Sequence, residues 1–248
     1  MHFPRTDSPA HQSADHSAAP EIHADPWAHI QLSPEICGKA QRATSPEQLE
    51  SIYRFRYDIL CDVHRKAHPE ADHQNRRLTD DLDQPAFNIF VSGSKGIYAV
   101  GRLVRATHPL AHSCILAAGG APFLARFGNE GVAQVGRLCQ IGNPAGALGV
   151  IATIQAHMLA AVNTGIHAAV CTTHPKNRNL FERMGCFFFG RQYQHAYLGE
   201  QIGMAIMCRD VEYMQRMKSP LAAAAATQGH LEEDARWFRN TFPITAGN

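Results

Sequence analysis

The chain has 248 residues, of which 45% are hydrophobic and 18% charged, so it suits one domain with tails and can bury a sizeable core. A formal net charge of +1 argues against a nucleic-acid binder, and the absence of an apolar run of roughly 18 residues argues against a membrane span. The N-terminus lacks the apolar stretch of a signal peptide and the seven cysteines show no CxxC spacing, so we expect a reduced, cytoplasmic compartment.

The patterning divides the chain into three parts. Residues 1–44 are rich in His, Ala, Ser and Pro, and we expect a flexible N-terminal tail with Trp27 as a candidate anchor. Residues 45–212 carry the regular hydrophobic patterns of one folded domain. Residues 213–248 are a C-terminal extension in which a short helix is predicted at 231–240, packed on the core or on a partner.

The first predicted element of the domain is a helix that begins after Ser45. Ser45 and Gln48 have the spacing of a capping box, and Pro46 stands at the first helical position, where its missing N–H does no harm. The stretch that follows, 61–84, is polar and irregular.

Strands and helices alternate along the rest of the domain. The predicted elements, in chain order, are a strand at 87–91, a hairpin turn at 92–96, a strand at 97–105, a short helix within 117–128, a strand at 132–141, a helix at 147–164 closed by Gly165, a strand at 167–173, a short helix at 177–184 closed by Gly185, and strands at 186–190 and 203–208. This order predicts an α/β fold with a mixed central β-sheet flanked by helices.

Three arginines fall on otherwise apolar faces, one in the first helix and two in strands: Arg56, Arg102 and Arg137. An arginine that faces a core is unfavourable unless an anion meets it. In the strand at 132–141, the apolar residues that share a face with Arg137 are Ala133, Val135, Cys139 and Ile141.

Carboxylates that could meet these arginines follow the first helix. The chain reads Asp80-Asp81-Leu82-Asp83, about two dozen residues after Arg56. Guanidinium groups and carboxylates inside an apolar scaffold suggest a polar substrate pocket. A purely structural ion-pair network is the alternative that the pattern leaves open.

These residues resemble a known family. The helix around Arg56, the Asp80-x-x-Asp83 pair, the Gly-Arg-Leu strand at 101–103, the Val-Gly-Arg-Leu strand at 135–138 and the segment 172–186 are similar to the acyl-homoserine-lactone synthases and their relatives, the N-acyl amino acid synthases. Both belong to the GCN5-related N-acetyltransferase (GNAT) superfamily. The resemblance covers about residues 45–210 and implies a GNAT-like sheet.

The resemblance also implies roles for residues of this chain. The residues assigned to catalysis are Asp80, Asp83, Arg137 and Gln134, with Asp80 or Asp83 as the candidate general base, acting directly or through water. The residues assigned to substrate binding are Arg56, Arg102, Leu138, Cys139, Gln140 and Phe181. Backbone N–H groups near Leu138 to Gln140 are the expected oxyanion donors, and the arginines are alternatively expected to grip an acceptor carboxylate.

Three positions depart from the family pattern. Autoinducer synthases usually carry a glutamate three residues before the strand arginine, where this chain has Gln134, which cannot act as a base. They favour a tryptophan after the first helix, where this chain reads Asp62-Val-His-Arg-Lys. Phe181 stands where a tyrosine often assists the leaving thiol. The first two departures favour the N-acyl amino acid synthase branch.

The acyl donor is predicted from the segment 141–149, which is glycine-rich but lacks the spacing and the basic residue of a coenzyme A pyrophosphate loop. This favours acyl carrier protein over acyl-CoA as donor, although a plain turn explains the glycines equally well. Basic residues form either a docking patch for the acidic carrier or an ordinary surface: Arg76, Arg77, Lys176, Arg178, Arg183 and Arg191.

The expected function is N-acyl transfer of a fatty, long-chain acyl group from acyl carrier protein to the amine of an amino acid or similar small amine. The alternatives are an acetyl-CoA-dependent acetyltransferase and a non-catalytic acyl- or ligand-binding protein. We predict no metal site, no tightly bound cofactor and no nucleic-acid partner.

Overall fold

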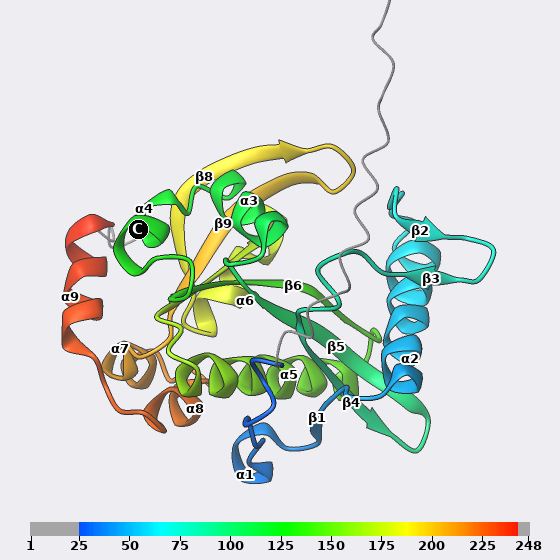
Figure 1. Ribbon diagram of the computed structural model, residues 1–248, viewed down its shortest axis with the longest axis horizontal. Coiled ribbons are helices and arrows are strands. Elements are labelled where there is room, and N and C mark those ends of the chain that lie inside the picture. Colours follow the sequence, from blue (N-terminus) through cyan, green and yellow to red (C-terminus); the bar gives the residue numbers. More distant parts are fainter. Residues whose placement is uncertain (1–24, 243–248) are drawn as a thin grey trace, which may run out of the picture.

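The structure is a computed structural model that describes residues 25–242. Its centre is a seven-stranded mixed sheet with strand order β1-β4-β5-β6-β7-β9-β8, beside a separate two-stranded sheet, β2-β3 (Figure 1). The strands are β1 (Ala40–Arg42), β2 (Ala71–Asp72), β3 (Arg77–Leu78), β4 (Phe87–Gly93), β5 (Gly96–Arg105), β6 (Val132–Gln140), β7 (Ala168–Thr173), β8 (Phe187–His195) and β9 (Gly199–Met207). The predicted α/β class with a mixed sheet is confirmed.

Helices cover both faces of this sheet. They are α1 (Pro34–Cys37), α2 (Pro46–Tyr57), the π-helical η1 (Asp58–Val63), α3 (Pro109–Ala117), α4 (Ala121–Phe127), α5 (Pro144–Asn163), the 3₁₀ turn η2 (Pro175–Asn177), α6 (Arg178–Arg183), α7 (Val211–Arg216), α8 (Ala222–Ala226) and α9 (Glu232–Thr241).

The two helices α5 and α2 lie on opposite faces of β4–β6 (Figure 1). Phe87 and Leu103 join the core beneath α5, whereas Phe90 and Val100 pack with Ile52 of α2. Because side chains alternate along a strand, the polar residues between the α5-facing positions point to the α2 side. The site described below therefore lies on the α2 face of the sheet.

The start of α2 follows the prediction. The hydroxyl of Ser45 accepts a hydrogen bond from the Gln48 backbone N–H, the Gln48 side chain accepts from the Ser45 N–H, and Pro46 occupies the first turn. The helix then continues as the π-helical turn η1, within the stretch predicted to be irregular. Together they carry Arg56 from a well-capped start into the interior.

A β-bulge sits where β5 meets β6. Val100 pairs with Cys139 and Arg102 pairs with Gly136, so two residues of β6, one of them Arg137, oppose Gly101 alone. Arg137 takes a left-handed backbone conformation, φ 53°, which is uncommon outside glycine.

The bulge corrects one prediction. Ala133 and Val135 pack beneath α5, but the extra residue shifts the alternation, and Arg137 points to the α2 face with Arg102 and Cys139. The expectation that Arg137 shares a face with Ala133 and Val135 was wrong because it assumed an unbroken strand.

Residues 25–44, which the patterning assigned to the tail, pack against the core. Trp27 is 1% exposed, and its indole N–H donates to the carbonyl of Pro85 at 3.0 Å. Strand β1 pairs antiparallel with β4 at the sheet edge. This part of the predicted tail is therefore continuous with the fold, and the remainder, residues 1–24, lies outside the described residues.

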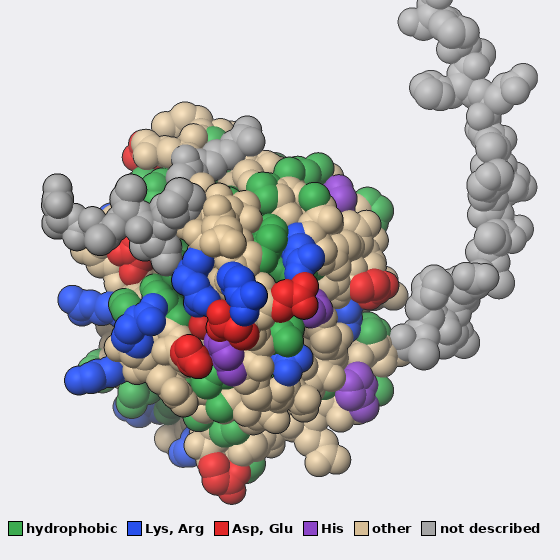
Figure 2. Space-filling view, turned by 90° about the vertical axis from the view of Figure 1, so that its left-hand side faces the viewer, with side chains coloured by type: hydrophobic (Ala, Val, Ile, Leu, Met, Phe, Trp, Pro, Cys, Tyr) green, Lys and Arg blue, Asp and Glu red, His purple; other side chains and the backbone are tan. Residues whose placement is uncertain are grey.

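The C-terminal extension also packs on the core. Helix α9 begins and ends within about a residue of the predicted 231–240 segment, and Phe238 is buried against Phe123 and Phe187. The His167 ring bonds Asp234 at 2.5 Å. Figure 2 shows the left-hand side of the view in Figure 1, where charged side chains of both signs gather. On α9 itself, Arg239 pairs with Glu232.

Two predictions of element boundaries were wrong. The single helix predicted within 117–128 is two helices, since α3 precedes α4. Strands β8 and β9 extend well beyond 186–190 and 203–208 through polar residues. A long hairpin that leaves the core has no apolar pattern by which to predict its tip.

Helix α5 is the one described helix long and apolar enough to cross a membrane by composition, and 61% of its apolar window is buried in this fold. It packs beneath the sheet, where the Cβ of an alanine at Gly101 would lie 2.9 Å from the His157 ring. Gly101 therefore permits a close approach between helix and sheet.

We expect the buried His157 to make the fold acid-sensitive. Burial lowers the pKa of His157 to about 4, although the nearby backbone of Gly101 and Phe87 opposes the shift. The unfolded chain takes up a proton near its ordinary pKa of roughly 6.5, whereas the folded chain stays neutral until about 4, so stability falls with pH across this window. The expected loss from about pH 7 to about pH 5 is about 2 kcal/mol.

Urea unfolding across this pH range measures the slope. The variant His157→Gln should flatten it, while the control His64→Gln, at an exposed loop position, should leave it unchanged. Equal slopes in wild type and His157→Gln would contradict the assignment.

Candidate functional site

The sheet opens between β6 and β7. The two parallel strands pair only from Val132 to Gln134, the last pair being Gln134 with Val170. Beyond it, β6 continues to Gln140 and β7 to Thr173 with no further pairing between them. Backbone groups along this opening are free of sheet partners on one side and can serve as hydrogen-bond donors to a ligand.

Exposure along β6 marks the same opening. Val132 and Ala133 are buried, yet the residues from Gln134 to Leu138 are all partly exposed, although the strand is fourth of seven in the sheet. A central strand is normally covered on both faces. The partly exposed run therefore marks the opening between β6 and β7, which is called the cleft below.

The innermost part of the charged site is an arginine buried under α2. Arg56 is 0% exposed; it donates to Asp83 at 2.5 Å and to the side-chain oxygen of Asn88 at 3.0 Å. The Asn88 amide donates in turn to the Asp83 backbone carbonyl at 2.8 Å. The buried guanidinium thus has an anion and a neutral acceptor.

The network continues outward from Asp83 through two strand arginines. Arg102 donates to Asp83 at 2.9 Å and makes a two-pronged contact with Asp80. Arg137 donates to Oδ2 of Asp80 at 2.7 Å and also to Glu70. Positive and negative groups therefore alternate along a chain of six residues: Arg56, Asp83, Arg102, Asp80, Arg137 and Glu70.

This network runs from the core to the surface. The side-chain exposure is 0% at Arg56 and 2% at Asp83 but 21% at Asp80 and 22% at Glu70. The outer end therefore meets the cleft and the inner end does not.

The outer end is completed by groups that the sequence did not reveal. His68 lies 3.2 Å from an Arg137 nitrogen, and the hydroxyl of Tyr197, from the β8–β9 turn, donates to Glu70 at 3.4 Å. The rings of His68 and Tyr197 lie edge to face, 5.1 Å apart. Glu70 and His68 lie in a polar loop without hydrophobic periodicity, so no sequence pattern marked them as site residues.

The electrostatics keep the acids ionised. Burial alone would raise the pKa values of Asp80 and Asp83, but the neighbouring arginines hold both well below the ordinary range. The same pairing raises the pKa of Arg137 in spite of its burial, through Asp80 and then Glu70. Three positive and three negative charges face one another at neutral pH.

The other predicted site residues line β6 or pack nearby. Gln134 donates to the Val135 carbonyl at 3.1 Å, and its side-chain oxygen has no hydrogen-bond partner among the described residues. Leu138 and Gln140 are half-buried beyond the point where the strands part. Phe181, on α6, packs against the core beneath α5.

Cys139 behaves as a packed thiol. It is buried with Ile52 and Val100, and burial raises its pKa to about 12, with Arg56 and Arg137 opposing. At that pKa the reactive thiolate is essentially absent at neutral pH. Cys139 therefore shapes the floor of the site and is no nucleophile.

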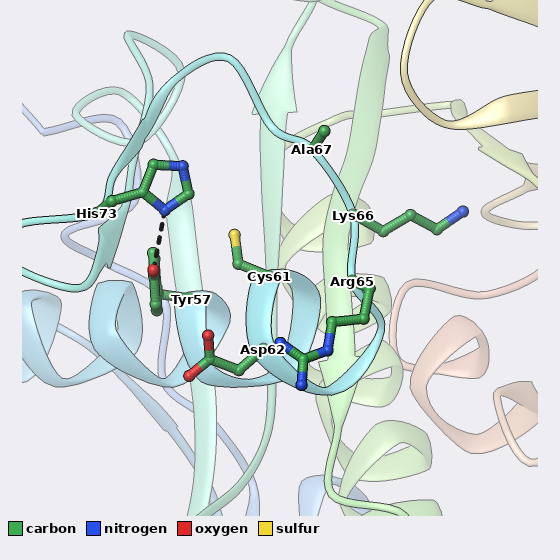
Figure 3. A pocket seen from close by; sticks show the side chains of 7 residues that line it. All are labelled: Tyr57, Cys61, Asp62, Arg65, Lys66, Ala67 and His73. Carbon is green, nitrogen blue, oxygen red and sulfur yellow. Dashed lines mark hydrogen bonds between the residues drawn. The ribbon is translucent and has the colours of Figure 1, made fainter.

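A pocket of about 300 Å³ adjoins this network on the side of α2 (Figure 3). The end of α2 and η1 form one wall and the loop that arches over them forms the other, with a hydrogen bond of 2.9 Å from Tyr57 to His73. Its lining residues are Tyr57, Cys61, Asp62, Arg65, Lys66, Ala67 and His73. The charges of Arg137 and Glu70 act on the Cys61 thiol, so this pocket neighbours the outer end of the network but is distinct from the cleft.

Three of the six residues of the predicted basic docking patch are paired with acids. Arg76 pairs with Asp58 and Asp62, Arg77 pairs with Glu50, and Arg178 pairs with Glu182. The side chain of Arg191 lies outside the described residues.

No protein-family model matches the sequence, and no curated protein matches it at a significant level. Solved structures do match. TofI, in a ternary complex with an inhibitor and MTA, is 16% identical and aligns with a TM-score of 0.57 over 74% of this chain and 98% of that chain. BjaI, a CoA-dependent acyl-homoserine lactone synthase with SAM and isopentyl-CoA, is 16% identical, with a TM-score of 0.54 over 75% of this chain and 95% of that chain.

FeeM, an N-acyl amino acid synthase from uncultured soil microbes, is 15% identical and aligns with a TM-score of 0.51 over 68% of this chain and 90% of that chain. At such identities a structural match speaks to the fold. The chain has the GNAT-like fold that acyl-homoserine lactone synthases share with an N-acyl amino acid synthase.

Proposed function

We propose that this protein is an N-acyltransferase that moves a fatty acyl group from acyl carrier protein to the amine of an amino acid or a similar small amine. The observation that carries the proposal is the cleft between β6 and β7 with the outer end of the charged network beside it. The acyl thioester lies along β6 beyond Gln134, where unpaired backbone N–H groups stabilise the negative oxygen of the tetrahedral intermediate.

The N-terminus of α5 supports a carrier-protein donor. Pro144 has no N–H, the Gly146 N–H donates to the Asn143 side chain at 3.0 Å, and the Ala147 N–H donates to the Asn143 carbonyl at 3.1 Å. A coenzyme A pyrophosphate needs several free N–H groups at such a terminus. The single phosphodiester of a phosphopantetheine arm needs fewer.

The acceptor class is supported by one residue of the site and by one structural comparison. Gln134 occupies the place of the glutamate that autoinducer synthases usually carry, and FeeM, which has the same fold, is an N-acyl amino acid synthase.

Every network arginine is already paired with a carboxylate, so none is left to bind an acceptor carboxylate. The alternative role of the arginines as a carboxylate fork is not supported.

Mass spectrometry of lipid extracts tests the proposal. Cells that overproduce the protein should contain a new N-acyl compound that disappears with Arg137→Ala and persists with Arg126→Ala, a control on α4 that faces away from the network in an ion pair with Glu233. The mass of the compound names both acyl chain and acceptor. A wild-type extract without a new lipid, with the protein present, would contradict the proposal.

The donor is settled with purified protein. Turnover with acyl-carrier protein that exceeds turnover with the matching acyl-CoA would support the carrier. The reverse preference would make the protein an acyl-CoA enzyme.

A further inference from the structure

The acceptor amine needs a group that can take its proton, and the two predicted bases have no capacity for it. Asp80 accepts four hydrogen bonds, from the Leu82 N–H, two from Arg102 and one from Arg137. Asp83 also accepts four, from Arg56, Arg102, the Thr79 hydroxyl and the Asp80 N–H. A carboxylate offers about four lone-pair positions, so both are saturated.

Glu70 differs from both aspartates. Its side-chain bonds, from Arg137 and Tyr197, fall on the same oxygen, Oε1. The second oxygen, Oε2, keeps acceptor capacity. Glu70 is as exposed as Asp80, at 22% against 21%, whereas Asp83 is 2% exposed. Glu70 is therefore the exposed network acid whose carboxylate keeps acceptor capacity for an incoming amine.

Glu70 remains ionised at neutral pH. Burial raises its pKa, but its own backbone N–H and the Arg137 guanidinium lower it by more. A carboxylate that stays charged attracts an ammonium group over the whole neutral range.

His68 supplies an independent sign of an unfilled site. An arginine can only donate, so the Arg137 N–H contacts Nδ1 of His68 as acceptor and the proton of the neutral ring sits on Nε2. His68 is 4% exposed, and its Nε2 has no hydrogen-bond partner among the described residues. A buried donor without an acceptor is unfavourable, so an atom from solvent or substrate completes it.

Two segments that are distant in sequence meet beside Glu70 and His68. The loop before β2 carries His68 and Glu70. The β8–β9 hairpin carries His195, at the end of β8, and Tyr197, in the turn, and their rings lie edge to face 4.5 Å apart. Aromatic rings beside a carboxylate that keeps acceptor capacity suit a small cationic group.

We infer that Glu70 receives the acceptor amine and takes its proton during transfer, an inference that rests on the proposed function. The bound ammonium first loses one proton to solvent. The neutral amine then attacks the thioester carbonyl, the C–N bond forms, and the nitrogen becomes positively charged. Glu70 Oε2 accepts one proton from that nitrogen; the tetrahedral intermediate then collapses, the C–S bond breaks, and the thiolate leaves and takes a proton from solvent. Glu70 returns its proton to solvent, so each turnover of one ammonium and one thioester yields one amide, one thiol and one net released proton.

The test pairs Glu70→Gln with the control Glu130→Gln, which removes one charge at an exposed turn beside Arg105. With the donor and acceptor identified above, Glu70→Gln should lower kcat on the order of 10²-fold with an unchanged KM for the acyl donor. The control should match wild type. Wild-type kcat in Glu70→Gln would overturn the inference.

A binding measurement separates this inference from the function on which it rests. Calorimetric titration with n-butylammonium, without acyl donor, should show binding to wild type and about tenfold weaker binding to Glu70→Gln. Equal binding, or no binding to wild type, would overturn the amine site. If n-butylammonium binds in a Glu70-dependent way but the protein forms no N-acyl product, the amine site is supported and the proposed transferase function is refuted.

Discussion

Replacing Arg56 by methionine is expected to lower the free energy of unfolding by about 3–5 kcal/mol, because it leaves Asp83 charged and buried at 2% exposure. Arg102 still pairs with Asp83, but the Asn88 side chain loses its donor as well. Methionine fills most of the volume, so the loss reports the broken charge pair rather than a cavity.

Urea unfolding monitored by circular dichroism measures this loss. Arg54→Met is the matched control, two residues earlier on the same helix, where the side chain is 63% exposed and pairs with Glu50. That variant should stay within about 0.5 kcal/mol of wild type. A similarly small change for Arg56→Met would mean that the inner network does not hold the fold.

The double variant Arg56→Met with Asp83→Leu shows how much of the stability loss comes from leaving Asp83 buried without Arg56, because it removes both charges of the pair. Removing both charges should recover part of the loss, because no buried carboxylate then lacks its arginine. Recovery is expected to be incomplete, since Asp83 also receives the Thr79 hydroxyl and the Asp80 N–H.

The network combines the two interpretations that its sequence pattern left open. Its inner half, Arg56 with Asp83, is closed to solvent, and both terminal nitrogens of the Arg56 guanidinium donate to buried acceptors, which is the arrangement of a structural ion pair. Its outer half, Arg137 with Glu70, borders the cleft and keeps acceptor capacity on one oxygen. A structural network therefore holds a reactive group at its surface end.

Local rules predicted the parts of the fold that local interactions determine. The capping box at Ser45 and the left-handed glycines at Gly165 and Gly185 need only a few neighbouring residues, and all are present. The meeting of Arg56 with Asp83 was also foreseeable, because a guanidinium on an apolar stripe demands an anion and the acids lie nearby in sequence.

The remainder depends on interactions that sequence periodicity does not report. A one-residue bulge changes which face Arg137 occupies, yet it leaves no mark in the hydrophobic pattern because Gly136 and Leu138 fit either alternation. Glu70 and Tyr197 are 127 positions apart and meet only because a long hairpin reaches back over the loop. Their contact depends on the tertiary structure, and no sequence motif predicts it.

The second large effect is expected at the bulge. Arg137→Gly should lower turnover on the order of 10²-fold while the free energy of unfolding changes by less than about 1 kcal/mol. Arg137 has φ 53°, a backbone conformation that glycine adopts without strain, so part of the lost pairing energy is recovered in the backbone. Asp80 and Glu70, at 21% and 22% exposure, are left within reach of water rather than buried without a partner.

The activity loss follows from what Arg137 connects. One terminal guanidinium nitrogen contacts Asp80 and Glu70 and the other terminal nitrogen contacts His68, and the single ammonium group of a lysine cannot reach all three. Arg137→Lys should therefore recover little activity and, because lysine keeps the strained backbone, should be less stable than Arg137→Gly. Steady-state kinetics and urea unfolding on the same preparations measure both quantities. If Arg137→Gly loses stability as Arg56→Met does, the outer half of the network is structural too, and the catalytic role assigned to it fails.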